Sequence, residues 1–172
     1  MDIHQLSKKY QVMILQSKDV EDVLELCLEN TLYYEYCPPL PTKESILEDM
    51  TKLPPRTTEK DKFYLGFYEK KKLIAVMDLI LGYPNEHTAF IGFFMLRKSL
   101  QGKGIGSSII DECFSYLHHF YSHIRLGYVL GNLQSEAFWL KQGFQRTGLV
   151  LKEENYSIVV LEHRIGGEID GH

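Results

Sequence analysis

The sequence predicts an α/β protein built around a mixed, mostly antiparallel β-sheet, and three observations lead to this prediction. Apolar segments of strand length alternate along the chain with segments whose apolar residues recur at helical spacing. Two strands in the middle, 63–68 and 73–81, are joined only by the charged turn Glu69–Lys72, which is typical of an antiparallel hairpin. Further on, a buried strand, a glycine-rich turn and a helix follow one another as in a βαβ unit.

The first part of the chain is predicted to hold one strand and two helices before this hairpin. The strand covers 11–15, and a helix then runs to about Asn30 or slightly beyond, because apolar residues recur there at helical spacing. A proline-rich break over 37–41 follows, since proline removes a hydrogen-bond donor and restricts the residue before it. Thr42 can cap the second helix, which the prolines of 53–55 end.

The second part is predicted to hold a central strand followed by a helix, a strand, a helix and two strands. The segment 89–96 is apolar on both alternations, which indicates a strand covered on both faces. The helix after it has an apolar stripe at i, i+4 spacing, formed by Ile105, Ile109, Cys113, Leu117 and Phe120. The later elements are a strand over 124–129, a helix over 135–142, and strands over 144–148 and 156–163. This gives about seven strands flanked by about four helices, with a frayed end over 166–172.

Length and composition bound the class of protein. The 172 residues suit one domain spanning 1–172, and the 44% of apolar and 24% of charged residues exclude wholesale disorder and fibrous architectures. A net charge of −4 argues against a nucleic acid or an anionic membrane as the partner. The apolar stretches are far shorter than the roughly 20 residues of a membrane span. Three cysteines without metal-ligand spacing indicate a reduced, cytoplasmic setting and no metal site.

The turn between the central strand and the next helix is the most informative segment. Glycines stand at 102, 104 and 106, directly before the helix. Where Cβ atoms are missing, a phosphate can approach the backbone closely, and the unpaired N–H groups of a helix N-terminus can bind it. An ordinary strand-to-helix turn is the alternative. Two familiar phosphate cradles are excluded, because Ser107 stands where a dinucleotide fingerprint needs its third glycine and the P-loop pattern is absent.

Two motifs in this part of the chain resemble those of the GNAT acetyltransferases. Gln101, Gly104 and Gly106 fill the fixed positions of the family's Gln/Arg-x-x-Gly-x-Gly/Ala element. The second motif is the segment Asn-x-x-Ala-x-x-Leu/Phe-Tyr-x-x-x-Gly-Phe, which the chain resembles at Asn132, Phe138, Trp139, Gly143 and Phe144, with Ser135 at the alanine position. Both motifs occur in the family's order on the expected strand–helix units. The resemblance therefore covers nearly the whole chain and implies the GNAT fold.

The resemblance implies that the protein binds acetyl-CoA and moves its acetyl group to an amine. By position, the backbone of Met95 and Leu96 is expected to pair with the pantetheine arm, and a free N–H near Leu96 is expected to bind the oxyanion. The residues expected to line the pantetheine and thioester are Asn132, Ser135, Phe138 and Trp139. The backbone amides from about Gly102 to Ser107 are expected to hold the pyrophosphate, and the cofactor-binding residues of this segment are Gln101, Gly102, Lys103, Gly104, Ile105, Gly106 and Ser107. Lys98 and Lys103 are suited to add charge near the phosphates, and solvated surface lysines are the alternative, above all for Lys98.

The motifs leave the catalytic groups open. Trp139 stands where the family usually has a tyrosine acid, and an indole N–H is not a practical acid. Either CoA leaves as the thiolate, or a group such as Tyr128 protonates it, although Tyr128 also suits the role of a strand aromatic. Asp78 interrupts the apolar strand 73–81, which makes it a candidate base or acceptor-binding group, or else a hydrogen-bonded structural aspartate. His87, at the start of the central strand, is a further candidate.

The resemblance places the acceptor site after the first helix. Tyr33, Tyr34 and Glu35 stand there, and aromatic faces beside a carboxylate suit a cationic amine, although packing against the proline loop is the other interpretation. The acceptor is expected to be a small-molecule or peptide amine, and a homodimer is compatible with the sequence. The alternative function is a non-catalytic module that senses acetyl-CoA or CoA, which the tryptophan at 139 keeps open.

Overall fold

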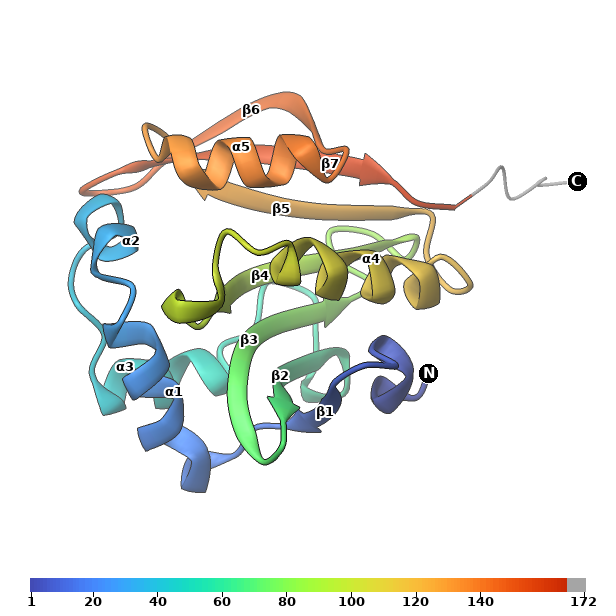
Figure 1. Ribbon diagram of the computed structural model, residues 1–172. Helices are drawn as coiled ribbons and strands as arrows, with labels where there is room; N and C mark the ends of the chain where they lie inside the picture. Colours follow the sequence, from blue (N-terminus) through green and yellow to red (C-terminus); the bar gives the residue numbers. More distant parts are fainter. Residues whose placement is uncertain (167–172) are drawn as a thin grey trace, which may run out of the picture.

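The computed structural model describes residues 1–166, and Figure 1 shows how its helices and strands are arranged. The strands are β1 (Gln11–Ile14), β2 (Lys62–Glu69), β3 (Lys72–Leu81), β4 (Thr88–Leu96), β5 (His123–Val129), β6 (Gln145–Lys152) and β7 (Ser157–Arg164). The α-helices are α1 (Val20–Leu28), α2 (Thr31–Tyr36), α3 (Lys43–Thr51), α4 (Ile105–Leu117) and α5 (Leu133–Lys141). Short 3-10 helices cover Ile3–Leu6, Ser17–Asp19, Glu59–Asp61 and Lys98–Leu100.

The strands form one seven-stranded sheet in the order β1-β2-β3-β4-β5-β7-β6. Neighbouring strands are antiparallel, except that β4 and β5 are parallel and are connected through α4. The predicted fold class is confirmed, because the sheet is mixed and mostly antiparallel and four of the helices, α1, α3, α4 and α5, have nine or more residues.

Each face of the sheet has its own apolar core. On one face, α4 buries Ile109, Cys113 and Leu117 completely, which are three of the positions in the predicted stripe. On the other face, Val23 of α1 and Ile46 of α3 pack with residues of β2 and β3. Complete burial of an aliphatic side chain of this size stabilises the fold by about 1.5–3 kcal/mol. The two cores hold the middle of the sheet firmly, and β4 runs through that middle.

The central strand β4 contains a β-bulge at the point where it leaves its parallel neighbour. Asp78 of β3 faces Phe93, and the next residue of β3 faces Ile91, so Gly92 is an extra residue in β4. The parallel pairing of β4 with β5 runs from Thr88↔His123 to Ile91↔Leu126, and it stops at the same place. The last five residues of β4 therefore continue with β3 on one side only, and this divergence opens the sheet between β4 and β5 (Figure 1).

Several element ends differ from the prediction. The first helix ends at Leu28 and a separate helix α2 begins at Thr31, because Asn30 between them leaves the helical conformation (φ −100°, ψ 55°). Phe120, assigned to the stripe of α4, follows the end of that helix and is 47% exposed. Strand β6 continues to Lys152 instead of ending near Gly148, since a shift in register around this glycine lets the pairing with β7 resume.

A short 3-10 helix stands at the start of the chain. The 3-10 helix Ile3–Leu6 was not predicted, and the Asp2 side chain caps it by accepting a hydrogen bond from the His4 N–H at 3.0 Å. At the other end, the tail predicted to be frayed begins at Gly166, whose N–H donates to the Ser122 carbonyl at 3.1 Å. The rest of that tail, 167–172, lies outside the described residues. Within 1–166, none of the helices is both long and apolar enough to cross a membrane.

Candidate functional site

A cavity of about 490 Å³ lies where β4 and β5 diverge. Its lining comes from the start of α2, the end of β4, the glycine turn, and the start and inner face of α5. The cavity reaches both faces of the sheet, because Phe94 and Phe138 belong to the α4 side while Met95 and Tyr33 belong to the α1 side. The residues predicted for the cofactor that line it are Met95, Leu96, Lys98, Gln101, Gly102, Gly104, Gly106, Ser107, Asn132, Ser135, Phe138 and Trp139.

The open edge of β4 presents backbone groups to this cavity. The Arg97 N–H donates to the Ile74 carbonyl of β3 at 2.7 Å. Along an antiparallel ladder, the backbone groups of successive residues point alternately toward and away from the neighbouring strand. The N–H of Met95 therefore also points toward β3. The N–H groups of Leu96 and Phe94 point away from β3, toward the side where β5 no longer pairs with β4. The register thus selects Leu96 and Phe94 as the backbone positions facing the cavity, where the sequence predicted Met95 and Leu96.

The glycine turn has the conformation that a close backbone approach requires. Gly102 and Gly104 have φ values of 76° and 79°, in the left-handed region that favours glycine. A Cβ at either position would meet nothing within 4 Å among the described residues, so the space beside the turn is open. Gly104 is the N-cap of α4, and the first N–H groups of this helix have no carbonyl partner within the helix. Gly106 serves packing, because a Cβ there would lie 3.3 Å from the Phe138 ring.

The side chain of Gln101 is directed toward the protein. Its Nε2 donates to the Leu96 carbonyl at 2.8 Å and to Asn30 Oδ1 at 2.7 Å. The Asn30 amide donates in turn to the Leu96 carbonyl at 3.3 Å and to the Leu26 carbonyl at 3.0 Å. Asn30 was not predicted, and the only sequence signal for it is a polar residue at the end of an apolar helix face. Together the two amides fix the last carbonyl of β4.

An aromatic wall closes the cavity on the α5 side. Phe138 stacks on Phe94 with ring centroids 6.2 Å apart, and Trp139 meets both rings edge-on. Trp139 is only 7% exposed, although it lines the cavity. Asn132 caps α5 by accepting a hydrogen bond from the Ser135 N–H at 3.2 Å, and the Gln142 amide donates to Ser107 Oγ at 2.8 Å. These two bonds tie α5 to its preceding loop and to the start of α4.

Asp78 lies on the α1–α3 face of the sheet and forms a buried ion pair. Its Oδ2 accepts a hydrogen bond from Lys62 Nζ at 3.2 Å, and the same ammonium donates to the Lys52 carbonyl at 2.7 Å. Oδ1 is buried and accepts no hydrogen bond from any residue within 1–166. Burial raises the pKa of Asp78 to about 6, although the Lys62 charge acts in the opposite direction. A Cβ at Gly92 would lie 2.8 Å from Oδ2, so the glycine of the bulge makes room for this carboxylate.

The predicted acceptor residues divide into two groups. Tyr33 lines the cavity and meets Tyr34 and Phe93 edge-on, at centroid distances of 4.9 and 5.9 Å. Burial raises the pKa of both tyrosines well above the usual range, so their hydroxyls stay protonated. Tyr34 packs in the α1–α3 core, and Glu35 is exposed, outside the lining of the cavity.

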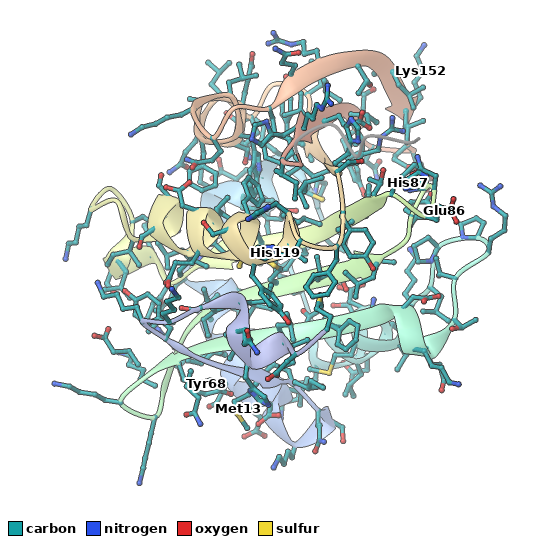
Figure 2. The ribbon with its side chains drawn as sticks, turned by 90° about the vertical axis from the view of Figure 1, so that its right-hand side faces the viewer. Met13, Tyr68, Glu86, His87, His119 and Lys152 are labelled. Carbon is teal, nitrogen blue, oxygen red and sulfur yellow. The ribbon has the colours of Figure 1, made fainter. Side chains whose placement is uncertain are left out.

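Four other predicted positions also lie outside the lining. Tyr128 is 4% exposed and belongs to the core beneath α4, which agrees with its alternative interpretation as an aromatic residue of a strand. His87 lies directly before β4, at the end opposite to the cavity, and its exposed ring contacts Glu86 at 3.3 Å (Figure 2). Lys103 is exposed on the glycine turn, and Ile105 is the first residue of α4. The polar groups of the cavity therefore come from the start of α2, the end of β4, the glycine turn, and α5 with its cap Asn132.

Arg97 is a second residue that the sequence did not indicate. Its guanidinium donates to the Leu73 carbonyl twice, at 3.0 and 2.8 Å, and to Glu29 at 2.6 Å. The residue is 5% exposed, so the end of β4 is anchored to β3 and α1 beneath the cavity floor. A charged residue directly after a buried strand is the signal that it carried in the sequence.

Comparisons with known proteins agree with this geometry. The model of the acetyltransferase (GNAT) family matches residues 25–144. An acetyltransferase from Thermus thermophilus has a TM-score of 0.73 at 17% identity, over 91% of this chain and 97% of that chain. The PaiA N-acetyltransferase from Thermoplasma acidophilum in complex with coenzyme A has a TM-score of 0.66 at 18% identity, over 90% and 98%.

A third solved structure has the same fold. It is an acetyltransferase from Salmonella typhimurium that modifies the N-terminal serine of ribosomal protein L7/L12, with a TM-score of 0.71 at 14% identity over 95% of this chain and 99% of that chain. Among curated proteins no sequence matches. The family model spans both sequence motifs that line the cavity, and it extends over most of the chain. The chain belongs to the acetyltransferase (GNAT) family.

Proposed function

We propose that the protein transfers the acetyl group of acetyl-CoA to a primary amine, by direct attack in a ternary complex. The observation that carries this proposal is the cavity between the diverging strands, which opens to both faces of the sheet. One part of its lining holds the glycine turn with Lys98 and Lys141, and another part holds Tyr33 at the start of α2, while Asp78 lies outside the lining, on the α1–α3 face of the sheet. A thioester bound through one face and an amine approaching through the other would meet beside the end of β4.

The residues at the first opening fit the chemistry of CoA. The open space beside Gly102 and Gly104 admits a phosphate to the backbone, and the N-terminus of α4 favours negative charge there. Lys98 and Lys141 line the same end of the cavity and supply positive charge. The apolar wall of Phe138 suits the pantetheine arm, which the open edge of β4 can meet with Leu96 and Phe94 backbone groups. Acetyl-CoA supplies an activated acyl group whose thiol leaves readily.

The N–H of Leu96 is the proposed donor to the thioester oxygen. This N–H faces the cavity. The end of its strand is fixed by the Arg97 N–H, which donates to β3, and by the Leu96 carbonyl, which accepts from Gln101. A fixed donor of this kind stabilises the charge that develops on the oxygen during attack, because it needs no reorganisation at that moment. Trp139 shapes the wall beside it and donates no proton, so the thiol of pKa about 8.5 leaves as the thiolate.

Asp78 is the proposed acceptor-side carboxylate. An alkylamine has a pKa of about 10.4 and is mostly protonated at neutral pH, so it must lose a proton before it attacks. The raised pKa of Asp78, about 6, makes this carboxylate a better proton acceptor than an exposed one while leaving it ionised at neutral pH. Its Oδ1 is buried and accepts no hydrogen bond within 1–166, so it has a lone pair with which to accept the proton through a relaying water molecule. The acceptor is accordingly a cationic amine, on a small molecule or a peptide.

Amine-dependent release of free thiol tests the proposal. The intact protein is incubated with acetyl-CoA and a panel of amines that includes small alkylamines, polyamines, aminoglycosides and peptides with a free N-terminus. We expect time-dependent thiol release above the rate of hydrolysis with at least one class, and an acetylated amine as the product. A protein that binds CoA calorimetrically but releases no thiol with any amine is a sensor of CoA, the second function that Trp139 in place of tyrosine favours.

A further inference from the structure

The last carbonyl of β4 lies at the rim of the cavity and is fully occupied by protein donors. The Leu96 oxygen accepts from Gln101 Nε2 at 2.8 Å and from Asn30 Nδ2 at 3.3 Å, which uses both of its lone pairs. The N–H of the same peptide, which belongs to Arg97, donates to the Ile74 carbonyl at 2.7 Å. This peptide is therefore held at both ends, and the N–H groups of Leu96 and Phe94 remain on the open side of β4 to face a ligand.

Asn30 is the residue that joins this peptide to the rest of the cavity wall. It is 8% exposed, and three of its four hydrogen-bonding sites are used by Leu26, Leu96 and Gln101. The arrangement specifies an amide, because two carbonyl oxygens face its nitrogen and an N–H group faces its oxygen. A carboxylate of the same shape would set negative charge against the two carbonyls and lose both donor bonds.

The position of Asn30 gives these bonds a consequence for both substrates. The residue stands in the joint between α1 and α2, and the following residues Thr31, Leu32 and Tyr33 line the acceptor side of the cavity. Through Gln101 the same side chain holds the beginning of the glycine turn. The acceptor wall and the cofactor turn thus share one buried hydrogen-bonded joint.

We propose that Asn30 is a positioning residue for acetyl transfer. It holds the Leu96 peptide and the glycine turn in a fixed position relative to the part of the cavity wall that α2 forms. The inference rests on the proposed function. It means that Asn30, which itself lines the cavity, acts together with Gln101 as one unit on CoA binding by holding the Leu96 carbonyl. It also means that bound CoA strengthens binding of the acceptor through this joint, and that the coupling is reciprocal.

Calorimetric titration with CoA tests the proposal in Asn30→Ala, Asn30→Asp, Gln101→Ala and the double variant Asn30→Ala/Gln101→Ala. We expect each single change to weaken CoA binding about 10-fold, which corresponds to about 1.4 kcal/mol. The double variant is expected to bind no worse than the weaker single variant, because the two side chains belong to one unit. Asn30→Asp is expected to be at least as weak as Asn30→Ala, although its volume is unchanged.

Asn85 offers a matched control at the opposite end of β4. Its side chain accepts hydrogen bonds from the His87 N–H and the Thr88 hydroxyl, both at 3.0 Å, so Asn85→Ala removes an exposed amide that also caps backbone, far from the cavity. This control is expected to lower the melting temperature and leave the CoA dissociation constant unchanged. A merely structural Asn30 would behave in the same way as Asn85.

Two results would overturn the inference: normal CoA affinity in folded Asn30→Ala, or losses that multiply in the double variant. A third readout is the acceptor affinity with and without CoA, in which the coupling seen in the wild type is expected to vanish in Asn30→Ala. Failure of the proposed function looks different, because the wild-type protein itself would then bind no CoA or release no thiol.

Discussion

At the scale of single residues, Asp78 is the group on which the proposed chemistry depends most. Asp78 is 9% exposed, its Oδ2 is paired with Lys62, and its Oδ1 accepts no hydrogen bond from the residues that the structure describes. We expect Asp78→Asn to lower turnover by roughly 10²-fold or more with a CoA dissociation constant within a few-fold of the wild type. Initial rates with the best amine of the panel measure this. Asp111→Asn, an exposed change on α4, is the control and should keep the wild-type rate.

Lys62 supplies a second test that a purely structural aspartate would fail. The lysine charge lowers the pKa of Asp78, which burial raises to about 6, so Lys62→Met removes the lowering influence. In Lys62→Met, the rise of kcat/KM with pH is expected to move to higher pH. In Asp78→Asn, the part of this rise that follows the ionisation of Asp78 is expected to disappear. A folded Asp78→Asn protein with the wild-type rate and pH profile would remove Asp78 from the active site.

The raised pKa of Asp78 also predicts how the stability of the folded protein depends on pH. The pKa of Asp78 in the folded protein, about 6, lies above the value of about 3.9 for an unfolded chain, so the folded state binds the proton more tightly. Its contribution to stability is fully present below about pH 4 and is lost as the pH rises through about 6. Urea unfolding of wild type and Asp78→Asn across this window should show a falling difference. A difference that rises with pH would contradict the assigned burial.

Sequence reasoning at the residue scale found groups that stand out locally and missed those defined by distant partners. Asp78 was visible because a carboxylate interrupts an apolar strand, but its ammonium partner comes from another strand. Asn30 and Arg97 belong to no motif, and their roles appear only when α1, β3 and β4 come together. His87 lies directly before β4, at the end opposite to the cavity, because the residues of a strand do not indicate at which end a sheet opens.

At the scale of elements, the end of β4 is held by the Arg97 clamp. The arginine is 5% exposed and supplies the donors to the Leu73 carbonyl, so Arg97→Met leaves this carbonyl and the Glu29 carboxylate without their partner. We expect a loss of about 2–4 kcal/mol in the free energy of unfolding.

The matched control for this clamp is Arg125→Met. Arg125 pairs with Glu162 across β5 and β7, but both side chains are partly exposed, at 26% and 30%, so the expected loss is about 0–1 kcal/mol. Urea unfolding of both variants measures the two losses. Equal losses would show that the clamp under the cavity is no stronger than an ordinary surface pair.

The elements with strong periodic or turn signals were predicted correctly, but several of the residues at which elements begin and end were not. The hairpin of β2 and β3, the stripe of α4 and the glycine turn all follow from local chemistry. The break at Asn30 does not, because its capping bonds to the Leu26 and Leu96 carbonyls exist only in the folded protein. The bulge at Gly92 also has no local signal, since a buried strand with one glycine looks continuous in the sequence.

At the scale of the whole molecule, the two-faced cavity predicts direct transfer between two bound substrates. Burial raises the pKa of Cys27 to about 11 and also raises the pKa of Cys113, so neither thiol is a ready nucleophile. Cys37 is half-buried after α2 and outside the lining of the cavity. Mass spectrometry after brief incubation with acetyl-CoA alone should therefore find no acetylated cysteine. An acetyl-Cys37 that passes its acetyl group to added amine would contradict direct transfer.

The order of the elements allowed the fold class to be predicted, and two motifs on consecutive strand–helix units indicated where the cofactor cavity lies. What the order does not contain is the chemistry of the acceptor side, which α2, α3 and β3 assemble from separate parts of the chain. This is why the cofactor residues predicted from the sequence mostly line the cavity, whereas of the predicted acceptor residues only Tyr33 does.

The central claim is that the cavity between β4 and β5 binds CoA through the glycine turn, and calorimetric titration of Gly104→Val with CoA tests it most directly. Gly148→Val is the matched control, because Gly148 on β6 also has a positive φ (88° against 79°) and a Cβ there would also meet nothing within 4 Å. Both changes therefore carry a similar backbone cost of about 1–2 kcal/mol. We predict that Gly104→Val stays folded and loses CoA binding, while Gly148→Val binds like the wild type. Unchanged CoA affinity in folded Gly104→Val would contradict the account.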